Sequence, residues 1–197
     1  MGFFDFLRPF KPVARPVKPI PTVVVDHPTQ GPTAVPVATR KSNRFAAGTA
    51  GAALLVSTIG GFEGLRQTAY PDPATKGEPW TICYGHTGKD VTPGVKYSLE
   101  QCKSLLIQDT SYAWVKIQQC TKGTDQWGDS RAVAVLSLAY NIGAGSYCKS
   151  SVAKAFNEGR AEDACDNLLK FNRAAGMVMA GLTRRRQKER TMCLENI

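Results

Sequence analysis

The sequence contains only two histidines, His27 and His86, and none of its six cysteines belongs to a Cys-x-x-Cys pair. Closely spaced cysteines and histidines are the usual zinc ligands, so their scarcity predicts that the chain has no metal site. We also find no internal repeat, and 43% of the residues are hydrophobic. That fraction can supply a buried core and argues against a chain that is disordered throughout.

Acidic residues are in the minority, because 16 Asp and Glu face 25 Lys and Arg and leave a net charge of +9. The excess is uneven: residues 1–44 carry seven basic residues against two acidic ones. A basic surface attracts any polyanion, so nucleic acid, anionic lipid and the acidic bacterial envelope are all compatible with this charge. Charge alone does not choose among them.

The first 44 residues lack the composition of a folded domain. Eight prolines lie between Pro9 and Pro36, and they favour an extended polyproline conformation without a core. A short apolar cluster opens the chain and consists of Phe3, Phe4, Phe6, Leu7 and Phe10. We therefore predict a stiff basic arm that binds a partner or a membrane surface.

Charge is absent from residues 45–62, which follow Arg40, Lys41 and Arg44 and precede Glu63. A segment of this length meets the minimum for a membrane span with its basic side in the cytoplasm. Four glycines and five alanines nevertheless make it weakly hydrophobic. Two interpretations stay open: a membrane segment, or a buried helix of a soluble domain.

The remainder, residues 62–197, is expected to form one α+β domain. Residues 64–95 are rich in Tyr, Thr, Gly and Pro, which is typical of short hairpin strands and turns. Helical signals follow, with a cap at Ser98 and a strongly apolar, central helix that begins at Asp129 or Ser130. Three further helices are expected at residues 151–157, 161–171 and 182–192. The sequence predicts a small hairpin lobe and a helical lobe with a cleft between them.

All the cysteines lie in this last part of the chain, at Cys83, Cys102, Cys120, Cys148, Cys165 and Cys193. An even number in a small domain predicts up to three disulfides, and hence an oxidising compartment such as the periplasm. Buried free thiols are the alternative. Six cysteines allow 15 pairings, and the sequence does not select one.

Two acids and a hydroxyl lie close together at the start of this domain. Glu63 is followed by Asp72 and then by Thr81, among glycine, proline and aromatic residues that build tight turns. Hydrolysis of a glycosidic bond uses a protonated acid to release the leaving oxygen and a carboxylate that activates water or stabilises the transition state. The stretch therefore has the side chains that a glycosidase needs.

The same stretch resembles the phage-type lysozymes of glycoside hydrolase family 24, whose pattern is Glu, Asp, then Thr followed by Ile-x-x-Gly-His. The matching residues are Glu63, Asp72, Thr81, Ile82, Gly85 and His86. Two further segments match in the same order along the chain. Residues 140–145 resemble the family's Phe/Tyr-Asn-x-Gly-x-Gly segment, and residues 181–189 resemble its Gly-Leu-x-x-Arg-Arg-x-x-Glu signature.

The resemblance implies that Glu63 is a general acid, while Asp72 and Thr81 hold a water on the opposite face of the sugar and so give inversion. One departure bears on the last two. The family commonly has five residues between the Asp and the Thr, whereas eight lie here, at residues 73–80, and we expect them to bulge outward as a turn. Each residue also has an ordinary, non-catalytic interpretation. Glu63 would be a solvated residue at a helix end, Asp72 a turn former, and Thr81 a common strand residue.

Other matched residues are expected to support the site: His86, Tyr140, Asn141, Gly143, Arg184 and Arg185. The histidine is expected to brace Glu63 or the hairpin by hydrogen bonding. The segment at residues 140–145 would line the cleft or simply end a helix, and the two glycines in it are expected to end that helix. The arginines would pair internally or meet anionic peptide stems, with a solvated basic helix face as the alternative.

The resemblance implies a phage muramidase that hydrolyses the β-1,4 bond between N-acetylmuramic acid and N-acetylglucosamine in peptidoglycan, without a metal or organic cofactor. Nucleic acid is not an expected partner. Two settings in the host periplasm compete. Residues 45–62 also resemble the segments of signal-anchor-release endolysins, which leave the host inner membrane, whereas an arm at residues 1–44 suits binding to virion proteins. An inactive lysozyme-like structural or wall-binding module is a third possibility.

Overall fold

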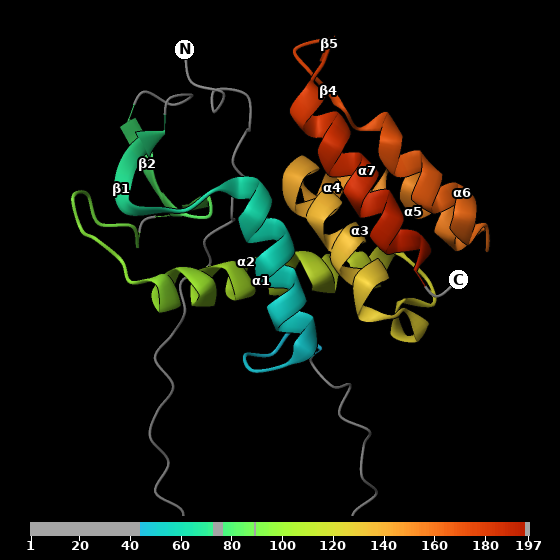
Figure 1. Ribbon diagram of the computed structural model, residues 1–197, viewed down its shortest axis with the longest axis horizontal. Helices are drawn as coiled ribbons and strands as arrows, with labels where there is room; N and C mark the ends of the chain where they lie inside the picture. Colours follow the sequence, from blue (N-terminus) through green and yellow to red (C-terminus); the bar gives the residue numbers. More distant parts are fainter. Residues whose placement is uncertain (1–43, 73–76, 89, 196–197) are drawn as a thin grey trace, which may run out of the picture.

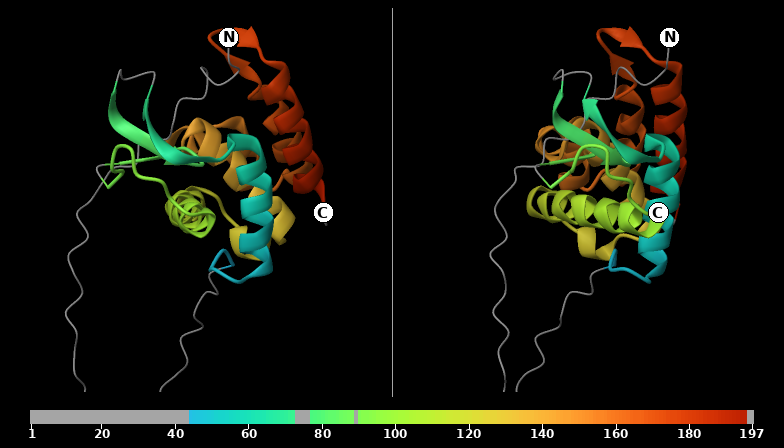
Figure 2. Two further views of the ribbon diagram at one scale, coloured as in Figure 1. Left: turned by 60° about the vertical axis from the view of Figure 1, so that its left-hand side comes forward. Right: turned by 90° about the vertical axis from the view of Figure 1, so that its left-hand side faces the viewer.

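The computed structural model describes residues 44–72, 77–88 and 90–195, which form a small antiparallel sheet beside a larger helical lobe (Figure 1). The predicted α+β architecture is confirmed. Nearly all of the predicted N-terminal arm lies outside the described residues. A long helix, α2 (Leu99–Cys120), runs beneath the sheet and reaches the helical lobe (Figures 1 and 2).

The sheet contains β1 (Arg66–Asp72), β2 (Gly77–Cys83) and β3 (His86–Thr87) in that order, all antiparallel. Pro71 pairs with Trp80, but the next residue, Asp72, pairs with Gly77, so the ladder is irregular at this point. Prolines are tolerated in a strand at such bulges. The expectation that residues 73–80 form a turn is therefore wrong for residues 77–80, which belong to β2.

Helix α2 begins where its cap predicts. The Ser98 side chain accepts a hydrogen bond from the backbone N–H of Gln101, and the Gln101 side chain accepts one from the backbone N–H of Ser98. This reciprocal pair satisfies two donors that a helix start leaves free. The helix is thereby fixed in position under the strands that carry the candidate site.

The centre of the helical lobe is α3 (Asp129–Ile142), in which every residue from 132 to 140 is buried. Four helices pack against it: α1 (Ala50–Glu63), α2, α4 (Ala144–Cys148) and α7 (Ala180–Leu194). The predicted central helix is confirmed. Gly143 ends it with a φ of 88°, but Gly145 lies inside α4, so the second glycine does not end the helix.

The remaining elements are short. They are η1 (Thr124–Gln126), α5 (Ser151–Asn157), α6 (Ala161–Asn167), η2 (Leu168–Lys170), β4 (Arg173–Ala174) and β5 (Met177–Val178). The helix expected at residues 161–171 ends earlier, because the chain tightens into a 3-10 turn after Asn167. The hairpin of β4 and β5 was not predicted, since two-residue strands leave no periodic pattern.

The uncharged segment at residues 45–62 is folded into the helical lobe as α1 and the turn before it. Thr49 caps the helix by accepting from the N–H of Ala52, and Leu55 and Ile59 are fully buried. Phe45 is also buried and meets the ring of Trp114 edge-on, with centroids 5.3 Å apart. Among the described residues, no helix has both the length and the apolarity that a membrane crossing requires.

Candidate active site

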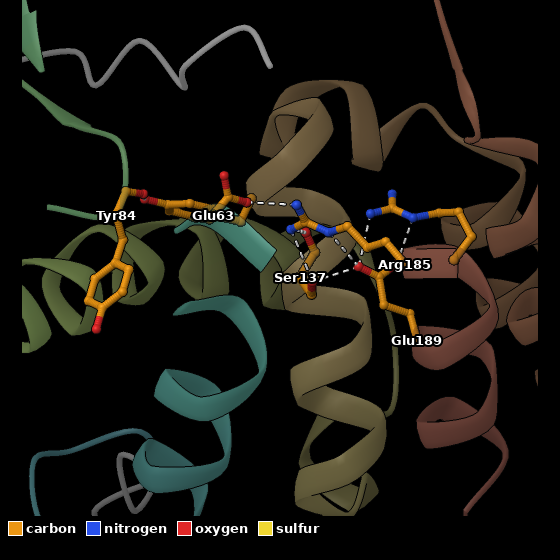
Figure 3. Close-up of polar contacts among 7 residues, drawn as sticks. Glu63, Tyr84, Ser137, Arg185 and Glu189 are labelled. Carbon is orange, nitrogen blue, oxygen red and sulfur yellow. Dashed lines mark hydrogen bonds and ion pairs between the residues drawn. The ribbon is translucent and has the colours of Figure 1, made fainter. Parts of the chain in front are cut away.

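Glu63 is the last residue of α1, and the helix stops there because Gly64 takes a positive φ of 73°. The chain then enters β1, so the carboxyl group lies where the helical lobe meets the sheet. Its side chain is 11% exposed, and Oε1 accepts a hydrogen bond from Nη1 of Arg185 at 2.7 Å. Figure 3 shows the other carboxyl oxygen pointing away from the arginine. One oxygen is therefore fixed by a cation while the second faces elsewhere.

Arg185 is itself held from two further directions. Its Nε donates to Oε1 of Glu189 at 3.1 Å, and its Nη2 donates to the carbonyl and hydroxyl oxygens of Ser137 at 3.1 and 3.2 Å. Only 4% of its side chain is exposed. The guanidinium group thus joins the end of α1 to the middle of α3 and α7 (Figure 3). Of the alternatives left open for the arginines, internal pairing is the one observed for Arg185, whereas Arg184 beside it is exposed.

Thr81 lies in β2 directly opposite Tyr70 of β1, and Asp72 ends β1 two residues further on. The hairpin therefore brings the backbones of both predicted residues into one ladder. Thr81 is 2% exposed, and among the described residues its hydroxyl group has no hydrogen-bond partner. Buried hydroxyl groups are nearly always paired with the protein or with ordered water, so this hydroxyl group is unusual.

His86 connects the sheet to the long helix beneath it and does not contact Glu63. Its Nδ1 lies 3.0 and 3.1 Å from the two carboxylate oxygens of Asp109 in α2, and its Nε2 lies 3.1 Å from Oδ2 of Asp90. Burial acts to lower the pKa of His86, but the hydrogen bonds and negative charges of Asp109 and Asp90 outweigh it and raise the pKa. Of the two braces expected for this histidine, the hairpin is the one observed.

Tyr140 fixes the turn that follows β2. Its hydroxyl group donates to the backbone carbonyl of Tyr84 at 3.1 Å, which ties α3 to the hairpin lobe. Burial, together with the negative charges of Asp109 and Glu63, raises the pKa of Tyr140 well above its usual value, so the phenol stays a donor. Asn141 follows in the last turn of α3 and is half-buried.

All six cysteines are paired, as Cys83–Cys102, Cys120–Cys148 and Cys165–Cys193. The first bridge joins the end of β2 to the first turn of α2. The second joins the end of α2 to α4, and the third joins α6 to the end of α7. Three disulfides are consistent with the predicted oxidising compartment.

Ser137, Asp90 and Asp109 were not singled out from the sequence, although each contacts a predicted site residue. Ser137 lies within an apolar helix, and both aspartates look like solvated charges, so no local signal marks them. In the parts of the chain that the structure describes, no three His, Cys, Asp or Glu side chains are grouped as metal ligands.

Comparison with known proteins agrees with this geometry. The sequence model of the family described as phage lysozyme matches residues 60–189. A SAR-endolysin of Bacteriophage PS119 is 35% identical over 73% of this chain and 84% of its own length. An endolysin of Bacillus phage B103 is 35% identical over 71% of this chain and 52% of its own length.

Solved structures show the same relationship. The active form of the P1 phage endolysin Lyz has a TM-score of 0.61 and 31% identity, covering 71% of this chain and 82% of that one. The muramidase domain of SpmX from Asticaccaulis excentricus has a TM-score of 0.64 and 30% identity, covering 72% of this chain and 95% of that one. Since the family match includes Glu63, the hairpin and all but the last turns of α7, this chain belongs to the phage lysozyme family and is a glycoside hydrolase of the lysozyme type.

Proposed function

We propose that the chain hydrolyses the β-1,4 bond between N-acetylmuramic acid and N-acetylglucosamine in peptidoglycan, with Glu63 as the general acid. The observation that carries this proposal is a nearly buried carboxyl group, held through one oxygen, next to a hairpin that bears Asp72 and Thr81. A general acid needs a carboxyl oxygen that is free to donate its proton to the leaving oxygen, and only one oxygen of Glu63 is engaged by Arg185.

In the proposed reaction, the oxygen of Glu63 that does not contact Arg185 protonates the glycosidic oxygen as the bond to the sugar breaks. A water attacks from the opposite face of the ring and inverts the configuration. Asp72 and Thr81 hold this water, and the carboxylate of Asp72 accepts its proton. The buried hydroxyl of Thr81, which has no partner in the described residues, supports this role because it can bind a water at no cost to an existing hydrogen bond.

Glu63→Gln tests the assignment, since it keeps the shape of the side chain and removes the proton. General acid catalysis is typically worth about 10²–10⁴-fold, so release of reducing sugar from purified peptidoglycan should fall by at least about 10²-fold. Unchanged thermal unfolding would show that the fold survives. Retention of more than half of the activity would refute the role of Glu63 and favour an inactive or different site.

We also propose that residues 45–62 first sit in the host inner membrane and later fold into the lysozyme as α1. Several relatives are named SAR-endolysins. The segment carries no charge and follows Arg40, Lys41 and Arg44, yet its many small residues make it weakly hydrophobic. Weak hydrophobicity suits a segment that must be stable in both environments. Before release, residues 1–43 would lie on the cytoplasmic side, and they would have to follow the segment across the membrane when it folds as α1.

Two glycines of α1 offer a matched test of this release. A Cβ atom at Gly51 would collide with the backbone carbonyl of Arg44, whereas Gly61 has open space around it. Gly51→Leu should therefore keep the protein in the membrane fraction after the membrane potential is collapsed, while Gly61→Leu, which adds the same apolar surface, should still be released. Wild-type protein that never pellets with membranes, but is found by mass spectrometry in purified phage particles, would favour the virion setting instead.

A further inference from the structure

A chain of four charges runs inward from the candidate acid, and it alternates in sign. Glu63 contacts Arg185, Arg185 contacts Glu189, and Glu189 contacts Arg186. The last two side chains are fully buried, with exposed fractions of 0%. Figure 3 shows these charged side chains extending from the end of α1, past Ser137 on α3, to α7. The mechanism proposed above uses only Glu63 and its contact with Arg185.

Stability alone is a weak explanation of this arrangement. Buried ion pairs are costly because two charges lose their hydration, and well-packed apolar residues often replace them without loss. Here the cost is not fully offset. Nε of Arg186 lies 2.9 Å from Oε2 of Glu189 without hydrogen-bond alignment, and Nη1 of Arg186 has no partner among the described residues. A different role for the buried charges therefore has to be considered.

The geometry around Arg185 supplies one. A guanidinium group is a rigid plane, so fixing two of its nitrogens determines where the third points. Glu189 fixes Nε, and Ser137 fixes Nη2 through two acceptors. Ser137 also donates to Oε1 of Glu189 at 2.6 Å. The position of Nη1 against Glu63 is thus determined by Glu189 and Ser137.

The charge balance supplies a second role. Arg185 contacts Glu63 directly. Arg186, the next residue on the same helix, also attracts Glu63 electrostatically. Cations near a carboxyl group favour its ionised form, whereas a general acid has to carry a proton. Burial raises the pKa of Glu189, but the charges of Arg186 and Arg185 act in the opposite direction, and the carboxylate of Glu189 offsets one of the two cations. Other described groups that face this region include the phenol of Tyr140 from α3, and Lys188, whose Nζ lies 5.4 Å from the ring of Phe62.

We propose that Glu189 is a positioning residue of the lysozyme reaction, which aims Arg185 at Glu63 and neutralises the buried charge of Arg186. This proposal rests on Glu63 being the general acid. Glu189 itself does not reach the substrate, because it is fully buried behind Arg185. It acts only through its neighbours.

The test is the pH profile of kcat on soluble peptidoglycan fragments, measured with the full chain and with Glu189→Gln. Removing the negative charge of Glu189 leaves the arginine cations uncompensated. A nearby cation typically lowers the pKa of a carboxyl group by one to three units, so the alkaline limb of the profile should move to lower pH by about one unit. At pH 7, kcat should fall about tenfold, with KM changed less than about twofold. A residue that only supports the fold would lower activity equally at every pH.

Arg186→Met provides the opposing variant and keeps the proposal testable if Glu189→Gln fails to fold. It removes the cation that Glu189 neutralises, so the alkaline limb should move to higher pH. The double variant should return toward the wild-type profile. Asp166→Asn is the matched control, because it removes the partner of Arg190 on the exposed side of α7 and should leave the profile unchanged.

Shifts of the two single variants in the same direction, or no shift in either, would overturn the proposal. Its failure can be distinguished from failure of the proposed function. If Glu63→Gln is inactive while the profiles of Glu189→Gln and Arg186→Met match the wild type, only the role of Glu189 is wrong. If Glu63→Gln stays active, the general acid lies elsewhere and both proposals fall.

Discussion

His86 on β3 and Asp109 on α2 form a buried link between the sheet and the helix beneath it, with Nδ1 of the ring 3.0 and 3.1 Å from the two carboxylate oxygens. The side chains are only 10% and 13% exposed. Despite burial, which acts in the opposite direction, the pKa of His86 is raised by Asp109 and Asp90. The folded protein therefore binds a proton here more tightly than the unfolded chain does.

This link predicts a pH-dependent stability. A raised pKa stabilises the fold fully below the unfolded value of about 6.5, and the contribution disappears as the pH rises through the pKa of the folded state. Urea unfolding of wild type and Asp109→Asn, with disulfides intact, should show the largest difference in unfolding free energy below about pH 6 and a smaller one at alkaline pH. Asp166→Asn should show a constant difference, and a constant difference for Asp109→Asn would contradict the assignment.

Local signals predicted most of the helices. Ser98 is a typical cap residue, and the glutamine three positions later completes the pattern of a helix start. The apolar run after Asp129 is long enough to identify a buried helix. Strand and turn assignments were weaker. The prolines and glycine of residues 73–80 favour a turn, yet residues 77–80 pair with β1 because a register shift accommodates them. Tertiary pairing there overrides local preference.

In the candidate site, too, some features could be predicted from the sequence and others could not. Glu63, Asp72 and Thr81 were singled out by their chemistry and order, and their catalytic roles stay predictions. The contacts around them could not be predicted, because they join residues far apart in the chain: Arg185 meets Glu63 across 122 positions, and Ser137 meets Glu189 across 52. The three disulfides are a similar case, since only the folded chain selects one of the possible pairings.

The disulfides should differ in their effect on activity. Replacing both cysteines of Cys83–Cys102 by alanine frees the end of β2, which carries Thr81, from α2. Removing a disulfide from a small domain typically costs about 2–5 kcal/mol. We expect this variant, assayed well below its Tm, to lose activity out of proportion to its folded fraction.

The matched control is removal of Cys165–Cys193, whose second cysteine is eight residues beyond Arg185 on α7, or about 12 Å along the helix. This variant should lose comparable stability in thermal unfolding but keep the turnover of its folded fraction. Equal losses of turnover in both variants would show that the first bridge has no special effect on the site.

Ala175 is a position where the chain should be easy to stabilise. It takes a φ of 48° in the turn between β4 and β5, followed by Gly176 at 80°. Left-handed backbone costs an alanine roughly 1–2 kcal/mol and glycine almost nothing. Ala175→Gly should therefore raise the unfolding free energy by up to about 1 kcal/mol in urea. Ala174→Gly, one residue earlier in β4, should lower it, and a loss of stability in both would contradict the strain at Ala175.

Thr81→Val separates the stability of the hairpin from its proposed role in holding water. Valine has nearly the same shape but no hydroxyl, and the hydroxyl of Thr81 is buried without a partner in the described residues. Since no hydrogen bond to the protein is lost, the melting temperature should stay unchanged or rise. Turnover should fall about 10–100-fold, because one hydrogen bond to the attacking water, worth roughly 1.5–3 kcal/mol, is missing in the transition state.

A combination with Asp72→Ala makes the argument sharper. If both residues hold one water, the double variant should lose less turnover than the two single losses multiplied together, since the second change removes an arrangement that the first has already broken. Strictly multiplicative losses would mean that the two act separately. A silent Thr81→Val would mean that the water is held by another group, and the unpaired hydroxyl would then be a cost of packing in the hairpin rather than part of the reaction.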